Sequence, residues 1–240
     1  MRKPPIQFSL IIPCYNEARN LALLVERCSA FLAQAPGGEV VLVDNGSKDD
    51  TPKILPGLLK GKAGLRTVRV EVNQGYGFGI ISGLRAAKGE ILGWTHADLQ
   101  TDPTDALRAL ALFDQAEDPR RLYVKGRRLG RPAFDVLFTN GMSAFETALT
   151  GVVLHDINAQ PNVFHRSFLE TWRNPPDDFS LDLYVYWLAK RAKLVVKRIP
   201  CQFPERLHGT SHWNTGLAGK WKFIRRTMDF SLRLRFKGVQ

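Results

Sequence analysis

Residues 90–100 have the sequence EILGWTHADLQ, in which a short apolar run leads into a polar cluster. The apolar run predicts a buried strand over residues 90–94. If this strand continues to residue 98, the alternation of side chains places His96 and Asp98 on the same side. With the Gln100 amide they would then gather at the carboxyl end of a strand, where open α/β sheets bind ligands. Oxygen donors there predict a site for a divalent cation that holds a diphosphate.

Strands and helices alternate on both sides of this segment. Apolar runs predict further strands over residues 7–12, 39–44, 65–72, 122–126 and 193–199. Apolar residues at helical spacing predict helices over residues 20–34, 50–60, 77–88, 104–114, 134–150 and 180–192. This order predicts an α/β fold with one open, mostly parallel sheet flanked by helices. In the helix over 77–88, small residues on one face predict close packing on the sheet: Gly79, Ser82, Gly83 and Ala86.

Composition favours one large domain in a reducing compartment. The chain has 240 residues, of which 44% are apolar. Its three cysteines are scattered and form no CxxC motif, which predicts reduced thiols in the cytoplasm. The opening residues MRKPPIQFSLIIPCYNE lack the long apolar core of a secretory signal. No window approaches the roughly 18 consecutive apolar residues of a membrane span.

The positive charge is concentrated near the C-terminal end. Residues 184–240 hold 13 of the 34 basic residues and 2 of the 23 acidic residues, so they carry the whole net charge of +11. This surplus suits an anionic partner such as lipid head groups, a phosphorylated acceptor or nucleic acid, although a solvated basic face is the alternative. Residues 216–240 form a basic amphipathic segment, and a helix there would suit a membrane interface. The alternation in residues 230–236 leaves a strand open for the last part.

Two more polar clusters follow predicted strands. The residues Pro13-Cys14-Tyr15-Asn16-Glu17 follow the first strand, and Asp44-Asn45-Gly46-Ser47 follow the second. Because the carboxyl ends of parallel strands meet at one edge, these clusters and residues 96–100 predict one shared ligand site. The glycine-rich residues 73–79 do not form the dinucleotide fingerprint G-x-G-x-x-G, because position 80 is Ile80. A Rossmann oxidoreductase is therefore excluded.

With these motifs the chain resembles the family 2 glycosyltransferases of GT-A fold, and among them the dolichyl- and polyprenyl-phosphate sugar synthases, over residues 7–215. The resemblance implies one domain over residues 1–215, with a Rossmann-like nucleotide-sugar half near 1–103 and an acceptor half near 104–215. The family motif D-D-G-S has an amide here, Asn45, whose carbonyl oxygen can still accept a hydrogen bond from a base. The resemblance implies these nucleotide-binding residues: Pro13, Tyr15, Asn16, Glu17, Asp44, Asn45, Asn73 and Ala97.

The family motif D-A-D-L-Q is matched by residues 96–100, with histidine in place of the first acid. The resemblance implies that Asp98 and Gln100 bind a divalent metal, Mn²⁺ or Mg²⁺. His96 is either a third ligand or a stacking neighbour. The loss of one carboxylate favours Mn²⁺, which accepts an imidazole more readily than Mg²⁺ does.

The acceptor half carries the other matched motifs. Arg128 stands at the arginine of the family's G-S-R motif, where a guanidinium grips an acceptor phosphate, and Arg131 is assigned as a second such residue. The family's R-x-x-G-x-S-K turn, which closes over the diphosphate, is matched by Arg206, Ser211 and His212. Asp182 stands where the wider fold has a base for hydroxyl acceptors. A phosphate is already anionic at pH 7, so Asp182 can instead be a structural acid paired with Arg or Lys.

These residues together predict an inverting, metal-dependent hexosyltransferase, with Asp98, Arg128 and Asp182 as its catalytic residues. It would move a hexose from a UDP- or GDP-sugar to a polyprenyl phosphate, as a peripheral protein on the cytoplasmic, inner face of the membrane. The alternative is a soluble glycosyltransferase that acts on a hydroxyl of a glycan or glycolipid, with Asp182 as base. A third hypothesis is a non-catalytic relative that binds an anionic membrane or, less favoured, nucleic acid.

Overall fold

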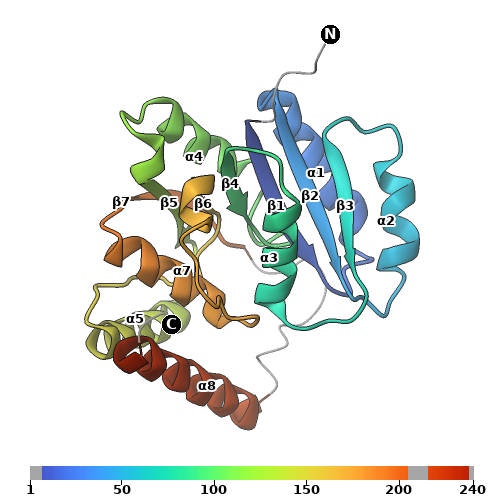
Figure 1. Ribbon diagram of the computed structural model, residues 1–240. Helices are drawn as coiled ribbons and strands as arrows, with labels where there is room; N and C mark the ends of the chain where they lie inside the picture. Colours follow the sequence, from blue (N-terminus) through green and yellow to red (C-terminus); the bar gives the residue numbers. More distant parts are fainter. Residues whose placement is uncertain (1–6, 205–215, 238–240) are drawn as a thin grey trace.

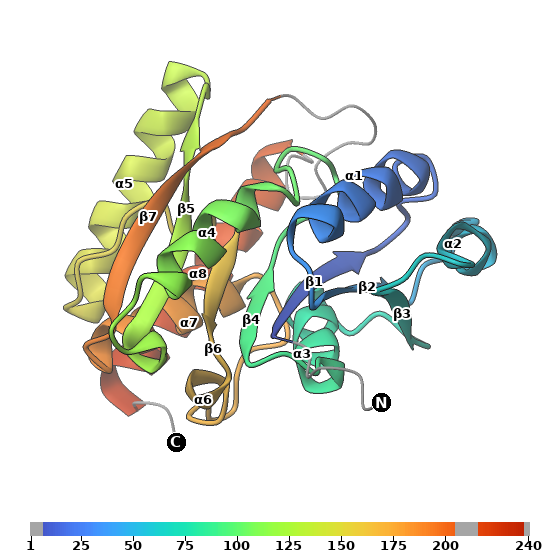
Figure 2. The same ribbon diagram turned by 90° about the horizontal axis from the view of Figure 1, so that it is seen from above.

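A computed structural model describes residues 7–204 and 216–237. One sheet contains seven strands in the order β3-β2-β1-β4-β6-β5-β7 (Figures 1 and 2). The strands are β1 (Phe8–Cys14), β2 (Gly38–Asn45), β3 (Leu65–Val70), β4 (Ile91–Trp94), β5 (Leu122–Leu129), β6 (Asn162–His165) and β7 (Val195–Gln202). Every registered pair is parallel except the two made by β6. The predicted mostly parallel sheet is therefore confirmed.

The helices lie on both faces of the sheet, as Figure 2 shows. They are α1 (Leu21–Gln34), α2 (Thr51–Leu59), α3 (Tyr76–Ala86), α4 (Asp105–Asp114), α5 (Ala133–Thr150), α6 (Arg166–Leu169), α7 (Ser180–Arg191) and α8 (Gly216–Lys237), with a 3-10 turn η1 (Pro119–Arg121). One core cluster joins α1, α2 and α4 to the sheet. A second cluster joins α3, α6 and α7 to the opposite face. Alternation along β1 separates the clusters, because Leu10 and Ile12 belong to the first and Ile11 to the second.

Small residues on α3 bring that helix against the sheet, as predicted. A Cβ added to Gly83 would stand 2.5 Å from Cγ2 of Ile11 and 2.8 Å from Cγ2 of Val43. Both distances are below any ordinary carbon contact. The helix can therefore approach β1 and β2 this closely only because position 83 has no side chain.

Three sequence expectations differ from the structure. β4 ends at Trp94, as predicted for the strand over residues 90–94, so the continuation to residue 98 that the alternation argument required does not occur: after one last sheet bond from the Thr95 amide to Ile11 O the chain turns, and Leu99 takes a positive φ of 61°. The alternation argument for His96 and Asp98 is therefore wrong. The four-residue strand β6, inserted antiparallel between β4 and β5, was not predicted. Residues 230–236 belong to the helix α8, so the alternative of a strand there is wrong as well.

Helix α8 packs on α5, and both stand at one end of the molecule, beyond α7 (Figure 1). Neither these two nor any other helix in residues 7–204 and 216–237 is long and apolar enough to cross a bilayer.

Candidate functional site

A cavity of about 730 Å³ lies at the carboxyl edge of the parallel strands and continues between α5, α7 and α8. Most of the residues selected from the sequence line it, although β4 stops short of them: Pro13, Tyr15, Glu17, Asn45, Asn73, His96, Ala97, Asp98, Gln100, Arg128, Arg131 and Asp182. The carboxyl ends of the strands thus bring both halves of the chain to one cavity. Arg206, Ser211 and His212 fall outside the described residues.

Two of the predicted nucleotide-binding residues do not line the cavity and instead hold its loops. Asn16 Oδ1 accepts a 2.8 Å hydrogen bond from the Lys48 amide. Asp44 is buried, and its Oδ1 accepts a 3.0 Å bond from the Ser47 amide. The Asn16 bond joins the loop after β1 to the loop after β2, and the Asp44 bond closes the turn after β2, so both residues support the loops at the cavity edge without lining it.

Asn45 has a structural contact that its sequence position did not predict. Its Nδ2 donates a 2.9 Å hydrogen bond to Gly75 O, just before α3. This bond fixes the orientation of the amide. The Asn45 Oδ1 atom is buried and makes no hydrogen bond with the part of the chain that is described. Asn45 therefore lines the cavity, while its one acceptor atom without a hydrogen bond is covered by the surrounding protein.

The segment after β4 carries the predicted metal ligands. Asp98 is 7% exposed, and its Oδ1 accepts a 3.2 Å bond from the Gln100 amide. The Gln100 side chain donates from Nε2 to Pro204 O at 3.0 Å. The His96 ring lies 6.0 Å from the ring of Tyr76, centroid to centroid. The neighbouring ring favours the interpretation of His96 as a stacking residue.

The donor set at this edge fits a hard divalent cation that a substrate helps to bind. Across the described ranges, no three His, Cys, Asp or Glu side chains are grouped closely enough to hold a metal ion by themselves. Asp98 and Gln100 offer one carboxylate and one amide oxygen. Mg²⁺ sites in phosphate-handling proteins commonly use one or two carboxylates, with substrate phosphates and water as the other ligands. The residues therefore fit a metal bound together with a diphosphate.

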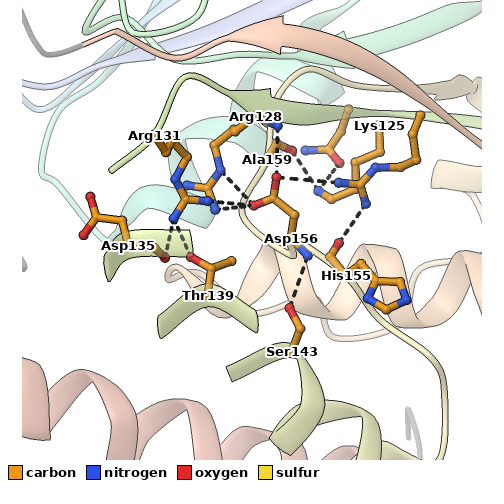
Figure 3. Close-up of polar contacts among 11 residues, drawn as sticks. Lys125, Arg128, Arg131, Asp135, Thr139, Ser143, His155, Asp156 and Ala159 are labelled. Atoms are coloured by element: carbon orange, nitrogen blue, oxygen red, sulfur yellow. Dashed lines mark hydrogen bonds and ion pairs between the residues drawn. The ribbon is translucent and has the colours of Figure 1, made fainter. Parts of the chain in front are cut away.

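Near the end of β5, three arginines surround the carboxylate of Asp156, and Figure 3 labels two of them, Arg128 and Arg131. Arg128 donates from Nε to Asp156 Oδ1 at 2.8 Å, and its second guanidinium nitrogen also bonds Oδ1. Arg131 lies 3.4 Å from Oδ1, and Arg198 lies 3.7 Å from Oδ2. Burial alone would raise the pKa of Asp156, but the arginines outweigh it and hold that pKa below its ordinary value. The cluster therefore has two positive charges in excess.

Local structure explains why these arginines converge. β5 carries Arg128 beyond its last pair with β6, and α5 begins shortly afterwards. Arg131 reaches back to α5, where it donates to Asp135 O at 2.8 Å and to Thr139 Oγ1 at 2.5 Å (Figure 3). Arg128 and Arg131 are only 13% and 9% exposed in their side chains. An anion bound there would meet poorly hydrated guanidinium groups, which strengthens its attraction.

Asp182 lies in the first turn of α7 and is 2% exposed. Its Oδ1 accepts hydrogen bonds from Gln160 Nε2 at 2.8 Å and from Asn162 Nδ2 at 3.0 Å. Within residues 7–204 and 216–237 it has no ion pair with Arg or Lys, the partner that the sequence left open. A buried carboxylate that faces a cavity and is held by neutral amides is suited to contact a ligand.

Sequence reasoning did not select several residues of this site. They are Tyr76, Lys125, Glu146, Gln160, Asn162 and Arg198. Arg198 meets Asp156 because β7 pairs in parallel with β5, with Lys125 opposite Arg198. No local pattern in the sequence predicts that these two strands pair. For Lys125, the one available signal was a lysine in the middle of an otherwise apolar strand.

The chain matches the model of the family "Glycosyl transferase family 2" over residues 9–172. An undecaprenyl-phosphate 4-deoxy-4-formamido-L-arabinose transferase of Pseudomonas savastanoi pv. phaseolicola is 38% identical over 122 residues, which cover 49% of this chain and 36% of that protein. A dodecaprenyl-phosphate galacturonate synthase of Rhizobium johnstonii is 28% identical over 174 residues, covering 69% of this chain and 49% of that protein. The chain thus spans about a third to a half of these relatives.

Solved structures show the same fold. A glucosyl-3-phosphoglycerate synthase from Mycobacterium tuberculosis, in complex with Mn²⁺, uridine diphosphate and phosphoglyceric acid, superposes with a TM-score of 0.71. The match covers 95% of this chain and 78% of that chain at 18% identity. A complex of the same enzyme with Mg²⁺ and uridine diphosphate gives a TM-score of 0.70, again at 18% identity, over 95% of this chain and 79% of that chain. At this identity the likeness establishes the fold alone.

Proposed function

This chain belongs to glycosyl transferase family 2, and from that premise we propose that it moves a hexose from a UDP- or GDP-sugar to a polyprenyl phosphate. Residues 1–103 would supply the donor half of the site and residues 104–215 the acceptor half. The named relatives, which act on undecaprenyl and dodecaprenyl phosphates, support this acceptor class.

The arginine cluster around Asp156 is the observation that carries the proposal. A phosphate monoester brings up to two negative charges, and the cluster offers two positive charges beyond those that Asp156 balances. Arg128 already makes two hydrogen bonds to Asp156 Oδ1, and a phosphate oxygen can accept the same pair of bonds beside that oxygen or in its place. An uncharged hydroxyl acceptor would gain little from this charge.

The donor would lie on the opposite side of the cavity. Pro13, Tyr15 and Ala97 line the part suited to the nucleoside, and Asp98 and Gln100 lie beside the part suited to the diphosphate. A divalent metal held by Asp98 and Gln100 would neutralise charge on the leaving diphosphate. Arg128 and Arg131 would hold the acceptor phosphate in line for attack on the anomeric carbon, which inverts it. Positioning and charge neutralisation are then enough for catalysis without a general base, since the acceptor is already an anion.

A lipid acceptor implies that the enzyme acts at a membrane surface, and the exposed apolar side chains support this location. Large apolar side chains are exposed on α5 and on the last turns of α8, beside the arginines of α8. We therefore propose peripheral attachment to an anionic membrane, on its inner face. Attachment of this kind agrees with the basic C-terminal segment.

A second candidate is transfer to a hydroxyl of a glycan or glycolipid. The burial of Asp182, its place on the cavity wall and its neutral amide partners favour this candidate, because they suit a general base. In that case Asp182→Asn should abolish transfer and leave nucleotide binding intact.

Acceptor competition separates the two candidates. The chain is incubated with Mn²⁺ and a panel of UDP- and GDP-hexoses, with either polyprenyl phosphate or the matching polyprenol as acceptor. We expect transfer to the phosphate alone. Arg128→Ala should lower kcat/KM for the lipid phosphate by about 100-fold, equivalent to roughly 2.7 kcal/mol.

Arg120→Ala is the control, because Arg120 is an exposed arginine on η1 that does not line the cavity. It should change kcat/KM by less than about twofold. Transfer to the polyprenol, lost in Asp182→Asn, would establish the second candidate. Failure to transfer any hexose to either acceptor would contradict both candidates.

A further inference from the structure

Lys125 is a fully buried lysine that the proposed function does not use. It lies in the middle of β5 with no exposed surface. Its Nζ donates to Ala159 O at 2.9 Å and to Asn162 Oδ1 at 2.8 Å, and it stands 5.5 Å from the centroid of the Tyr186 ring. These contacts give each of the three N–H groups of an ammonium a partner, two carbonyl oxygens and one aromatic face. These contacts favour the charged form, whereas the burial of Nζ opposes it.

Asn162 joins this ammonium to the cavity wall. Its Oδ1 accepts from Lys125 and from the Tyr123 hydroxyl at 2.6 Å, and its Nδ2 donates to Asp182 Oδ1 and to Gln160 Oε1 at 2.6 Å. Every donor and acceptor of the amide is in use. If the amide rotated by half a turn, its NH₂ group would face the ammonium. Lys125 thus fixes the orientation in which Asn162 donates to Asp182.

The charges near Lys125 come from several elements. Asp182 and Tyr186 face it from α7, Arg198 from β7, Asp156 from the turn before β6, and Arg128 from its own strand. Burial lowers the pKa of Lys125 to about 7, and Asp182 acts in the opposite direction. The charge of this lysine therefore depends on pH near neutrality and is coupled to the charge of Asp182.

We propose that Lys125 is a positioning residue for sugar transfer, whose ammonium acts through Asn162 to hold the Asp182 carboxylate in its orientation at the cavity. The inference rests on the proposed function and adds to it a role for Asp182, whose carboxylate contacts the bound ligand in that cavity and helps to align it for transfer. A buried ammonium is a costly way to fill a core, and an apolar side chain of equal volume is often as stable or more stable. Only the side chain of Asn162 separates Lys125 from the cavity-lining carboxylate of Asp182, so the ammonium is placed where it can orient that carboxylate.

Two variants separate charge from hydrogen bonding. Lys125→Met removes the charge and keeps the length of the side chain, whereas Tyr123→Phe removes the other donor to the same Asn162 oxygen and keeps the charge. Lys125→Met should lower kcat by about tenfold, with KM for the donor changed by less than about twofold. Tyr123→Phe should stay within about threefold in kcat. Thermal unfolding checks that each variant folds, and Lys125→Gln replaces Lys125→Met if the latter does not.

The pH profile supplies a readout that a purely structural role would not change. Lys125 is charged below its pKa, so wild-type kcat should fall as pH rises through about 7. Tyr123→Phe should keep this inflection, and Lys125→Met should lose it. The proposal would be overturned if Lys125→Met had the kcat and the pH inflection of the wild type. It would also be overturned if Lys125→Met and Tyr123→Phe lost kcat to the same extent.

An NMR titration keeps this test separate from the proposed function. In protein carrying ¹³C-labelled lysine, the signal missing from Lys125→Met should titrate near pH 7. In Asp182→Asn it should titrate at a lower pH, because a negative charge that favours the ammonium has been removed. A pKa that Asp182→Asn leaves unchanged would refute the coupling, whatever the transfer assays show. Absence of any sugar transfer by the wild type would instead count against the proposed function.

Discussion

Asp98 is a single carboxylate at the edge where a nucleotide diphosphate would bind. Its Oδ1 accepts from the Gln100 amide, a bond that an asparagine oxygen can also accept. Asp98→Asn should therefore keep the local fold and remove one negative charge from the metal site. We expect hexose transfer to fall by about 100-fold and the stabilisation by nucleotide sugar plus Mn²⁺ in thermal unfolding to disappear. A stabilisation by Mn²⁺ and donor equal to that of the wild type would rule out the metal role of Asp98.

Glu146 is a buried carboxyl group on α5 that hydrogen-bonds Ser231 of α8 through Oε2. Burial raises its pKa to about 6 from an ordinary 4.5, and the Ser231 hydroxyl offsets part of the rise. Because the folded-state pKa is the higher one, the stability that this group contributes is complete below pH 4.5 and is lost as pH rises through 6.

Glu146→Gln keeps the shape of the side chain and removes its titration. Relative to wild type, its free energy of unfolding should increase by about 2 kcal/mol between about pH 4 and about pH 8. Urea unfolding at several pH values measures this difference. Glu26→Gln, at an exposed position of α1, should change stability by less than about 0.5 kcal/mol at each pH. If the difference in free energy of unfolding between Glu146→Gln and wild type did not change with pH, the pKa of Glu146 would be the same in the folded and unfolded states, which would contradict this prediction.

At the scale of elements, the packing of α3 on the sheet depends on the missing side chain of Gly83. Gly83→Ala should lower the free energy of unfolding by about 1–3 kcal/mol, because Ile11 and Val43 leave no room for the new methyl group. Gly57→Ala is the matched control on α2, where an added Cβ would meet nothing within 4 Å. It should raise stability by up to about 1 kcal/mol through helix propensity alone. Equal effects in urea unfolding would mean that α3 can move away from the sheet without loss.

Most elements were predictable because their apolar residues repeat with the period of a helix or a strand. β6 was not, since four residues carry too little periodicity and its antiparallel place between β4 and β5 is set by tertiary pairing. The same distinction applies to the site. Residues in the loops that follow strands, such as Asp98 and Tyr15, were found because parallel strands end at one edge. Lys125 and Arg198 were missed, because their partners come from strands that only the folded chain brings together.

At the scale of the whole molecule, exposed apolar side chains are unevenly distributed. Phe134 and Leu137 on α5 are 73% and 70% exposed, and Phe236 on α8 is 76% exposed. α5 begins directly after the arginines proposed to hold the acceptor phosphate. A lipid whose phosphate reaches Arg128 would therefore have an apolar surface beside it, and this surface is the part of the molecule expected to meet a membrane.

Replacement of Phe134 and Leu137 by serine tests this surface directly. Each large apolar side chain contributes about 1.5–3 kcal/mol when it leaves water, so the double variant should bind vesicles of anionic lipid at least about tenfold more weakly. Val72→Ser is the control, because Val72 is 69% exposed but follows β3, at the opposite edge of the sheet. Added salt should weaken wild-type binding further, since Arg233 and Arg235 of α8 are exposed near Phe236. If sedimentation with vesicles gave the same binding for wild type and the double variant, the lipid phosphate would have to reach Arg128 from another side.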